Sequence, residues 1–289
     1  MLADFLYSHP TWLIGLIIIG IWTGLSLLGL VIFHRFVDVN LRHKDTETVG
    51  LTYAIVAVVY AVLIAFIVVN VFESAAKADE IATAEANQLS NLMLDANGLP
   101  PALGDKIRAD LNQYIDIVVK KEWPSQQAGK LDEPVFEPGW VSLGNLSTAL
   151  ASFEPATLGQ SVNKGAMMQA ADELIKARRN RIEAAGEHLP DVVWQILLLA
   201  GAIAVGYTYL FGAKSFGIHL SITGLISTTI ALVFVLIIAL DYPFRGEVSV
   251  GDDAFISVAA TASGVEAVPE PASTPELKSA PEAKPEPKH

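Results

Sequence analysis

Four long runs without a charged residue dominate this sequence. Each run is at least 22 residues long, and a helix that rises about 1.5 Å per residue needs only about 20 residues to cross a hydrocarbon core of about 30 Å. The charged fraction agrees, since it is 17% here and about 25% in a typical soluble domain. The runs are Trp12–Phe33, Thr48–Phe72, Val192–Ala213 and Ser215–Leu240. The sequence therefore predicts an all-α integral membrane protein with four transmembrane helices.

Short loops join the four predicted spans into two hairpins, one in residues 1–72 and one in residues 192–240. Between the hairpins lies a polar insert, residues 73–191, with 11 Lys or Arg and 18 Asp or Glu residues. It is the only segment for which we predict a water-soluble domain. A post-membrane segment covers residues 241–263. The last segment, 264–289, holds six prolines and five glutamates, and we predict a disordered tail because it cannot bury enough apolar surface to offset the entropy of ordering.

The insert is predicted to be helical and soluble. The second span continues without Gly or Pro to Asp95, which indicates one helix that leaves the bilayer. We expect Gly98 to end this helix in a left-handed conformation, Pro124 to end the next one, and residues 125–139 to form a loop. Pro190 is expected to break the last insert helix at the membrane surface. The remaining insert helices are predicted over residues 101–122, 141–152 and 155–188.

Basic residues near the spans bear on the orientation. The two short loops carry a dense basic group, which favours a cytoplasmic location for these loops and an external location for the insert. A second basic group lies close to the third span and favours the reverse, so the rule leans toward an external insert and leaves the alternative open. The first group is Arg35, Arg42, Lys44 and Lys214, and the second is Lys176, Arg178, Arg179 and Arg181.

The sequence carries no catalytic or metal-binding motif that we recognise. The six histidines are scattered without an i,i+4 pair, and no HExxH, Walker-type loop, GxGxxG or GxSxG occurs. There is no cysteine, and a pI of 4.9 argues against a nucleic-acid partner. We therefore predict no enzyme activity, no metal and no cofactor. His219 is interpreted as an interfacial residue, and the acidic pairs Asp79-Glu80 and Asp252-Asp253 as surface charge.

A stripe with several polar members follows one face of the second predicted span. If several subunits place this stripe on a common axis, it lines a narrow, uncharged pore whose apolar constriction at Leu63 and Ile67 gates by dewetting. The alternative is that its tyrosines pack against neighbouring helices or lie in an interfacial belt. The predicted pore-lining residues, which recur about every 3.5 positions, are Tyr53, Val56, Tyr60, Leu63, Ile67, Asn70 and Ser74.

Short motifs rich in charge, Trp and Pro flank the spans. We expect structural roles for them: Glu122 pairs with Arg178 and Arg181, which lie three apart on one helix face. Asp241, Pro243 and Arg245 form a turn at the membrane exit, in which the charges pair or the arginine extends to headgroups. In chain order the motifs are Glu122-Trp123-Pro124, Arg178-Arg179-Asn180-Arg181, Leu189-Pro190 with Trp194, and Leu240-Asp241-Tyr242-Pro243-Phe244-Arg245-Gly246.

These motifs resemble the bestrophin-like family of bacterial membrane proteins over roughly residues 10–255. The family is named for a distant likeness to bestrophins, which are pentameric anion channels with four spans and a helical insert. The resemblance implies an oligomeric channel lined by the second span, located in the inner membrane of a bacterium. In bestrophins the insert is cytoplasmic, and neither their calcium-binding acidic cluster nor their aromatic-rich pore neck is recognised in this chain.

Two functions remain open from the sequence. The first is an oligomeric ion channel that conducts inorganic ions across the lipid bilayer. The second is a non-conducting membrane scaffold or sensor whose insert and acidic tail bind a protein partner. No charged residue lies within a predicted span, which disfavours a proton-coupled transporter.

Overall fold

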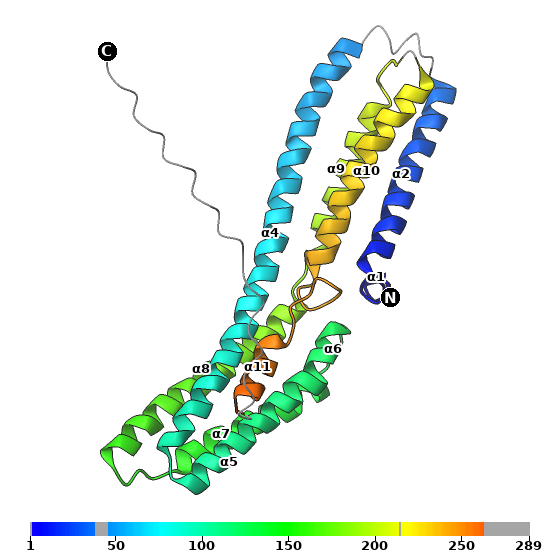
Figure 1. The fold of residues 1–289 in the computed structure, drawn as a ribbon. Coiled ribbons are helices and arrows are strands. Elements are labelled where there is room, and N and C mark those ends of the chain that lie inside the picture. Colours follow the sequence, from blue (N-terminus) through cyan, green and yellow to red (C-terminus); the bar gives the residue numbers. More distant parts are fainter. Residues whose placement is uncertain (1, 38–45, 214, 263–289) are drawn as a thin grey trace, which may run out of the picture.

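The computed structural model describes residues 2–37, 46–213 and 215–262. These residues contain helices and no strand. Figure 1 shows a bundle of long helices at one end of the molecule and a second group of helices at the other. Four helical segments in the described residues are long and apolar enough to cross a bilayer, which confirms the predicted all-α membrane architecture with a helical insert between the second and third spans. The predicted tail, 264–289, lies outside the described residues.

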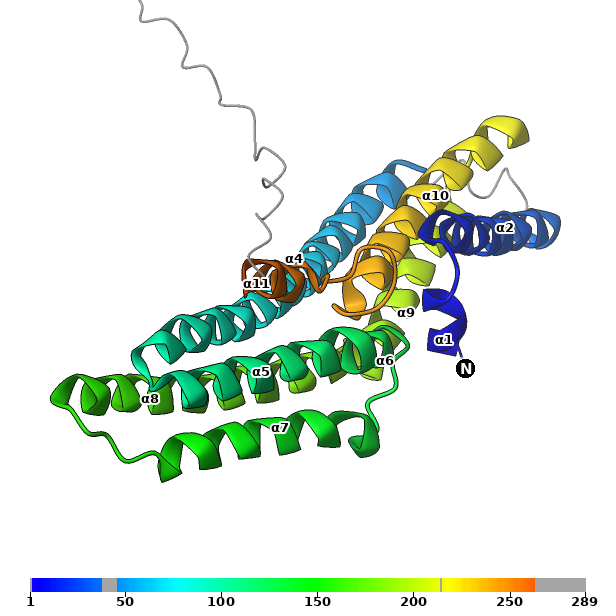
Figure 2. The ribbon, with the colours of Figure 1, turned by 60° about the horizontal axis from the view of Figure 1, so that its bottom comes forward.

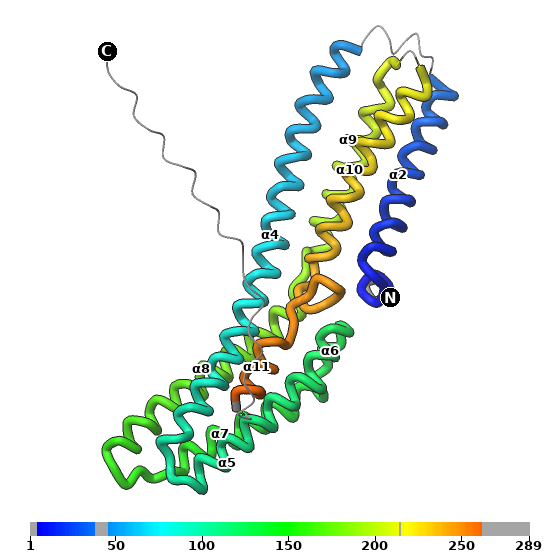
Figure 3. The backbone as a smooth tube through the Cα atoms, in the orientation of Figure 1, coloured from blue at the N-terminus to red at the C-terminus, as the bar shows by residue number. Residues whose placement is uncertain are grey.

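The membrane bundle contains four helices, with a short helix α1 (Leu2–Tyr7) before the first. Helices α9 and α10 lie between α2 and α4, so that α4 stands at one edge of the bundle (Figures 1 and 3). Helix α9 ends at Thr208 rather than at the expected Ala213, because a turn begins there. The bundle helices are α2 (Thr11–Phe36), α4 (Thr46–Asp95), α9 (Asp191–Thr208) and α10 (Phe216–Asp241).

Helix α4 belongs to both parts of the molecule. It runs for 50 residues, or about 75 Å, without a break. This agrees with the expectation that the second span continues out of the bilayer. Its C-terminal half buries a stripe of small residues against the insert, including Ala78, Ala82 and Ala86. Small side chains let helix α8 lie close along it, so α4 mechanically connects the membrane bundle and the insert.

The insert packs four further helical segments around the end of α4. Helix α8 lies along α4, and α7 packs against both α5 and α8 (Figure 2). The core between them includes Leu89, Leu111 and Leu174, all fully buried. The segments are α5 (Pro101–Ile117), a π-helical turn (Val118–Glu122) that leads into α6 (Trp123–Gln127), α7 (Glu133–Ser152) and α8 (Leu158–Gly186).

Gly98 does not adopt the predicted left-handed conformation. Among the described glycines only Gly129 and Gly246 have a positive φ. Gly98 instead ends a short 3-10 turn, and a Cβ there would lie 2.7 Å from the amide nitrogen of Asn163. The glycine is therefore explained by the close approach of α8 and not by a backbone angle.

Two predicted helix ends in the insert are also wrong, and proline position explains both. Pro124 is the second residue of α6 and follows directly on the π-helical turn, and the chain stays helical to Gln127. Similarly, α7 begins at Glu133 inside the predicted loop 125–139, with Pro134 in its first turn and Pro138 within the helix. A proline near a helix start is compatible with the helix.

The post-membrane segment contains a helix that the sequence did not indicate, α11 (Asp253–Ala262). It packs against α4 and α5. Its Phe255 side chain is fully buried, with its ring centroid 5.5 Å from that of Trp123, and Trp123 also contacts Phe244 at 5.5 Å. The chain that leaves the last span therefore folds back and completes the core of the insert.

This packing predicts that Phe255→Ala destabilises the insert by about 3–5 kcal/mol, because it leaves a cavity beside Trp123. The matched control is Ile256→Ala, whose side chain is 49% exposed and whose loss costs about 1 kcal/mol or less. Urea unfolding of the purified protein in detergent, followed by tryptophan fluorescence, measures both. Equal losses for the two variants would mean that α11 is not part of the folded core.

Candidate functional site

Helix α4 carries the residues predicted to line a pore, and the structure gives this helix two different faces. The inner face packs against α9 and α10, and it includes buried Tyr60, Ile67 and Val71. The outer face is uncovered in the protomer. Most of the predicted stripe, from Tyr53 to Ile67, lies on the inner face.

The N-terminal part of the predicted stripe, from Tyr53 to Ile67, contacts other helices of the same protomer. The hydroxyl of Tyr60 donates a hydrogen bond of 3.5 Å to the carbonyl oxygen of Leu197, and a Cβ at Gly201 would lie 2.7 Å from that hydroxyl. The ring of Tyr53 lies 6.1 Å from that of Tyr207. Within one protomer, Tyr53, Tyr60, Leu63 and Ile67 therefore contact neighbouring helices, and their role in lining a pore stays a prediction. These residues pack in the way described by the alternative, and Val56 beside them is half-buried.

The lower members of the stripe reach a different environment. Asn70 and Ser74 line a polar cavity of about 370 Å³ between α4 and the junction of α8 with α9. Across the cavity lie His188 and Asp241. The cavity thus lies where the spans end, to one side of the outer face of α4.

The outer face of α4 changes character along its length. In the bilayer it is apolar and highly exposed, with Phe66 at 73%. Beyond the bilayer the same face carries exposed carboxylates at Glu73 and Glu80. We define the outer face by exposed residues spaced three or four apart: Ile55, Val58, Val62, Phe66, Val69, Glu73, Ala76 and Glu80.

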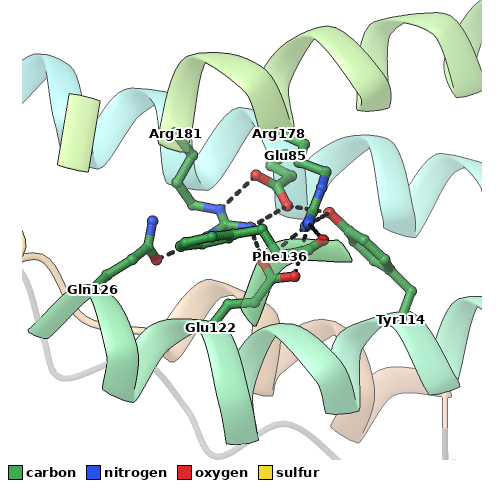
Figure 4. Close-up of polar contacts among 7 residues, drawn as sticks. All are labelled: Glu85, Tyr114, Glu122, Gln126, Phe136, Arg178 and Arg181. Atoms are coloured by element: carbon green, nitrogen blue, oxygen red, sulfur yellow. Dashed lines mark hydrogen bonds and ion pairs between the residues drawn. The ribbon is translucent and has the colours of Figure 1, made fainter. Parts of the chain in front are cut away.

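A network of four charged side chains lies in the insert, and all four are fully buried. Arg178 and Arg181 come from α8, while Glu85 comes from α4 and Glu122 from the π-helical turn (Figure 4). Two positive and two negative charges give a neutral cluster. Neutrality matters because an unpaired charge in a protein interior costs several kcal/mol.

The network contains the predicted pairing of Glu122 with both arginines. Arg178 donates to the two oxygens of Glu122 at 2.7 and 2.8 Å, which is a bidentate contact. Arg181 donates to Glu122 at 2.9 Å and to Glu85 at 2.7 and 3.1 Å. Glu122 therefore bridges the two arginines, and Glu85 fixes the cluster to α4.

Neutral groups complete the network. The hydroxyl of Tyr114 donates to Glu85 at 2.6 Å and accepts from Arg178 at 3.1 Å, and the side-chain oxygen of Gln126 accepts from Arg181 at 2.8 Å. Burial, with the neighbouring Glu85 carboxylate, raises the pKa of Tyr114 well above its usual value. Burial by itself would lower the pKa of Arg181, but Glu85, Tyr114 and Glu122 together outweigh burial and raise it. Tyr114 therefore stays neutral and Arg181 stays charged across the physiological range.

Gly139 allows α7 to close over this network. A Cβ at this position would collide with the guanidinium of Arg178 and with Glu122. The backbone of α7 also contributes, since the carbonyl oxygen of Phe136 accepts a hydrogen bond of 2.8 Å from Arg178. Five elements therefore meet at the two arginines, namely α4, α5, the π-helical turn, α6 and α7, although only Glu122 was predicted as their partner.

The remaining motif residues lie where the bundle meets the insert. Asp241 accepts hydrogen bonds from the Leu189 N–H at 2.6 Å and from the Trp194 indole at 3.2 Å. Pro190 precedes the first residue of α9. The C-terminus of α10 is thus fixed to the start of α9.

Arg245 and Pro243 shape the turn that follows α10. The guanidinium of Arg245 lies over the rings of Tyr7 and Tyr242, at 5.1 and 5.3 Å. A Cβ at Gly129, which has a φ of 68°, would lie 2.5 Å from the central carbon of that guanidinium. The carbonyl oxygen of Pro243 accepts from the Val250 N–H at 2.8 Å. Arg245 therefore contacts the insert loop after α6.

The described residues contain no group of three or more His, Asp or Glu side chains that could hold a metal ion. His219 is not interfacial as predicted but buried, and its Nε2 lies 2.8 Å from the carbonyl oxygen of Thr208. It fixes the start of α10 to the end of α9. The uncovered outer face of α4 is the candidate functional surface.

Comparison with known families gives one match. The bestrophin-like domain family matches residues 20–255. No curated protein matches this chain.

Solved structures of similar fold include bacterial bestrophin homologues from Klebsiella pneumoniae. One, which carries a single substitution, has a TM-score of 0.65 at 16% identity, covering 85% of this chain and 99% of the other. Another has a TM-score of 0.64 at 15% identity, covering 85% of this chain and 97% of the other. At this identity the likeness shows the fold alone.

The network predicts that Glu122→Gln destabilises the protein by about 3–5 kcal/mol, because it leaves two buried arginines with one carboxylate. The matched control is Glu183→Gln on the exposed surface of α8, for which the change is about 0.5 kcal/mol or less. Thermal unfolding in detergent compares the two with the parent protein. If Glu122→Gln unfolds at the parent temperature, the cluster is dispensable for stability.

Proposed function

Since the chain belongs to the bestrophin-like family, we propose that it forms an oligomeric ion channel in which the outer faces of α4 from several copies line the pore. The observation that carries this proposal is the uncovered outer face itself. It is a strip that is apolar over the bilayer and charged beyond it, where the exposed Lys77 lies between Glu73 and Glu80 along the helix. Lipid contact alone would explain the apolar part, but it does not explain why the same strip continues as carboxylates.

The position of α4 supports assembly around this helix. It stands at the edge of the bundle, and its inner face is already occupied by α9 and α10 (Figure 1). The four spans of one protomer pack around an apolar core that includes Leu197 and Phe234. A single copy therefore offers no aqueous path between its helices, and a pore needs several copies.

The side chains of the outer face suggest how such a pore works. Val62, Phe66 and Val69 form an apolar constriction when several copies meet, and such a constriction conducts only when it is wetted. Glu73 and Glu80 then form rings of negative charge at the mouth, which raise the local concentration of cations. Bestrophins conduct anions, so in this proposal the chain keeps their architecture and favours cations at its mouth.

The proposal also gives a location, namely the cytoplasmic membrane of a bacterium, where the protein is multi-pass. It rests on the four apolar helices and on the bacterial source of the similar structures. A protein partner of the tail remains a separate possibility, because that segment lies outside the described residues. The non-conducting scaffold becomes the better account if the protein carries no ions.

The channel proposal predicts that Phe66→Ser raises ion flux about tenfold. The substitution removes apolar surface from the constriction, which lowers the free-energy barrier to ion passage by about 1.4 kcal/mol. Leu25→Ser is the matched control: this side chain is 62% exposed on α2, away from α4, and its replacement leaves flux unchanged. Flux of K⁺ and Cl⁻ from liposomes gives the rates. Glu73→Gln is expected to lower the ratio of K⁺ flux to Cl⁻ flux.

Protein shown to be oligomeric and correctly inserted is needed for this comparison. Equal effects of Phe66→Ser and Leu25→Ser would contradict a pore along the outer face. No flux from the parent or from any variant would favour the scaffold.

A further inference from the structure

A second cavity, of about 450 Å³, lies on the other side of the bundle from the outer face of α4. It is bounded by α1, α2, α9 and α10, and we call it the apolar cavity. Its walls include Ile21 and Trp22 of α2, Leu198 of α9 and Phe234 of α10. Ile21 and Leu198 are exposed side chains within transmembrane helices, so the cavity opens toward the hydrocarbon of the bilayer.

The depth of the apolar cavity matches part of one leaflet. On α9 its lining runs from Asp191, the first residue of the helix, to Leu198, and on α10 from Tyr242 back to Phe234. Seven or eight residues of helix correspond to about 10–12 Å. Half of a hydrocarbon core is about 15 Å thick. The cavity therefore begins at the membrane surface beside the insert and ends within the same leaflet.

The surface end of the apolar cavity is polar and acidic. Asp191, Asp241 and His188 line it, together with the ring of Tyr7. Asp241 is engaged with the Leu189 N–H and with Trp194, whereas Asp191 and His188 are exposed. No Lys or Arg is among the lining residues. A ligand here has an apolar body and carries a positive group at the level of Asp191.

We propose that the apolar cavity binds an acyl chain of a zwitterionic aminophospholipid, with the ammonium of its headgroup beside Asp191. The bilayer supplies this molecule at the cavity opening, and its apolar chain and amine headgroup match the two ends of the cavity. A headgroup with a net negative charge would meet two carboxylates.

Native mass spectrometry tests this binding. Delipidated protein is incubated with phosphatidylethanolamine or phosphatidylglycerol of identical acyl chains, and the retained lipid is counted. We expect the parent protein to retain phosphatidylethanolamine in preference to phosphatidylglycerol. Leu198→Trp, which fills the cavity, is expected to reduce retention at least tenfold. Leu199→Trp, one position along and 63% exposed outside the cavity, keeps parental retention.

Two further pairs of variants separate the chain from the headgroup. Ile21→Trp fills the cavity from α2, with Leu25→Trp as its control, and keeps the test valid if Leu198→Trp fails to fold. Asp191→Asn is expected to lower the preference for phosphatidylethanolamine about fivefold, the effect of about 1 kcal/mol for one charge at a membrane surface. Glu187→Gln, which removes a charge from the other cavity, leaves that preference unchanged.

Three results would overturn the proposal. They are equal retention by Leu198→Trp and Leu199→Trp, equal or better retention of phosphatidylglycerol by the parent, and retention of detergent but of neither lipid. The binding does not depend on conduction, so its outcome is independent of the flux measurements.

Discussion

Four buried charges determine how the two halves of this protein are joined. Arg181 binds Glu85 of α4 and also Glu122, while Arg178 binds Glu122 through both carboxylate oxygens. A neutral apolar cluster of the same size could be equally stable. The charges also fix the register of α8 along α4. Each guanidinium donates hydrogen bonds in fixed directions, and a shift of α8 along α4 would break them. Because α4 is one helix, fixing it in the insert also fixes the rotation of its outer face in the membrane.

The chain after the last span strengthens the same connection. Asp241 fixes the end of α10 to the start of α9, and Arg245 lies against Gly129 in the loop of the insert. Phe255 of α11 then enters the core beside Trp123 and Arg181, at 5.8 Å from the guanidinium of the latter. A movement of the insert is thereby transmitted both to α4 and to the opposite hairpin. In a channel, this linkage would couple the constriction to whatever binds the insert.

Much of this architecture follows from local sequence. The four spans follow from uncharged length, and the continuity of α4 follows from the absence of Gly and Pro before Asp95. Glu122 could be predicted as the partner of the arginines, because Arg178 and Arg181 lie three apart on one helix face and Glu122 ends a neighbouring predicted helix. Glu85 was missed, although it is a lone acid among Ala78, Ala82 and Leu89 on the buried stripe of α4. An acid in such a stripe signals a buried partner, and its identity requires the fold.

The choice of face on α4 could not be made from sequence. Periodicity shows that residues share a face, but which face is covered depends on how α9 and α10 approach, and both faces of α4 are apolar in the bilayer. In the protomer, the face of α4 that carries the tyrosines is the one that packs against neighbouring helices. Helix α11 and the early start of α7 were missed for a related reason, because tertiary contacts stabilise both short segments. Helix α11 forms where Phe255 is buried, and the start of α7 forms, despite its prolines, where its backbone accepts a hydrogen bond from Arg178.

Crosslinking between subunits tests the account most directly, because the chain has no cysteine of its own. Phe66→Cys on the outer face of α4 and Leu25→Cys on α2 are each treated in native membranes with a short bifunctional maleimide. Copies that meet along α4 give covalent oligomers for Phe66→Cys and monomers for Leu25→Cys. Oligomers from Leu25→Cys, with Phe66→Cys remaining monomeric, would contradict assembly around the outer face of α4.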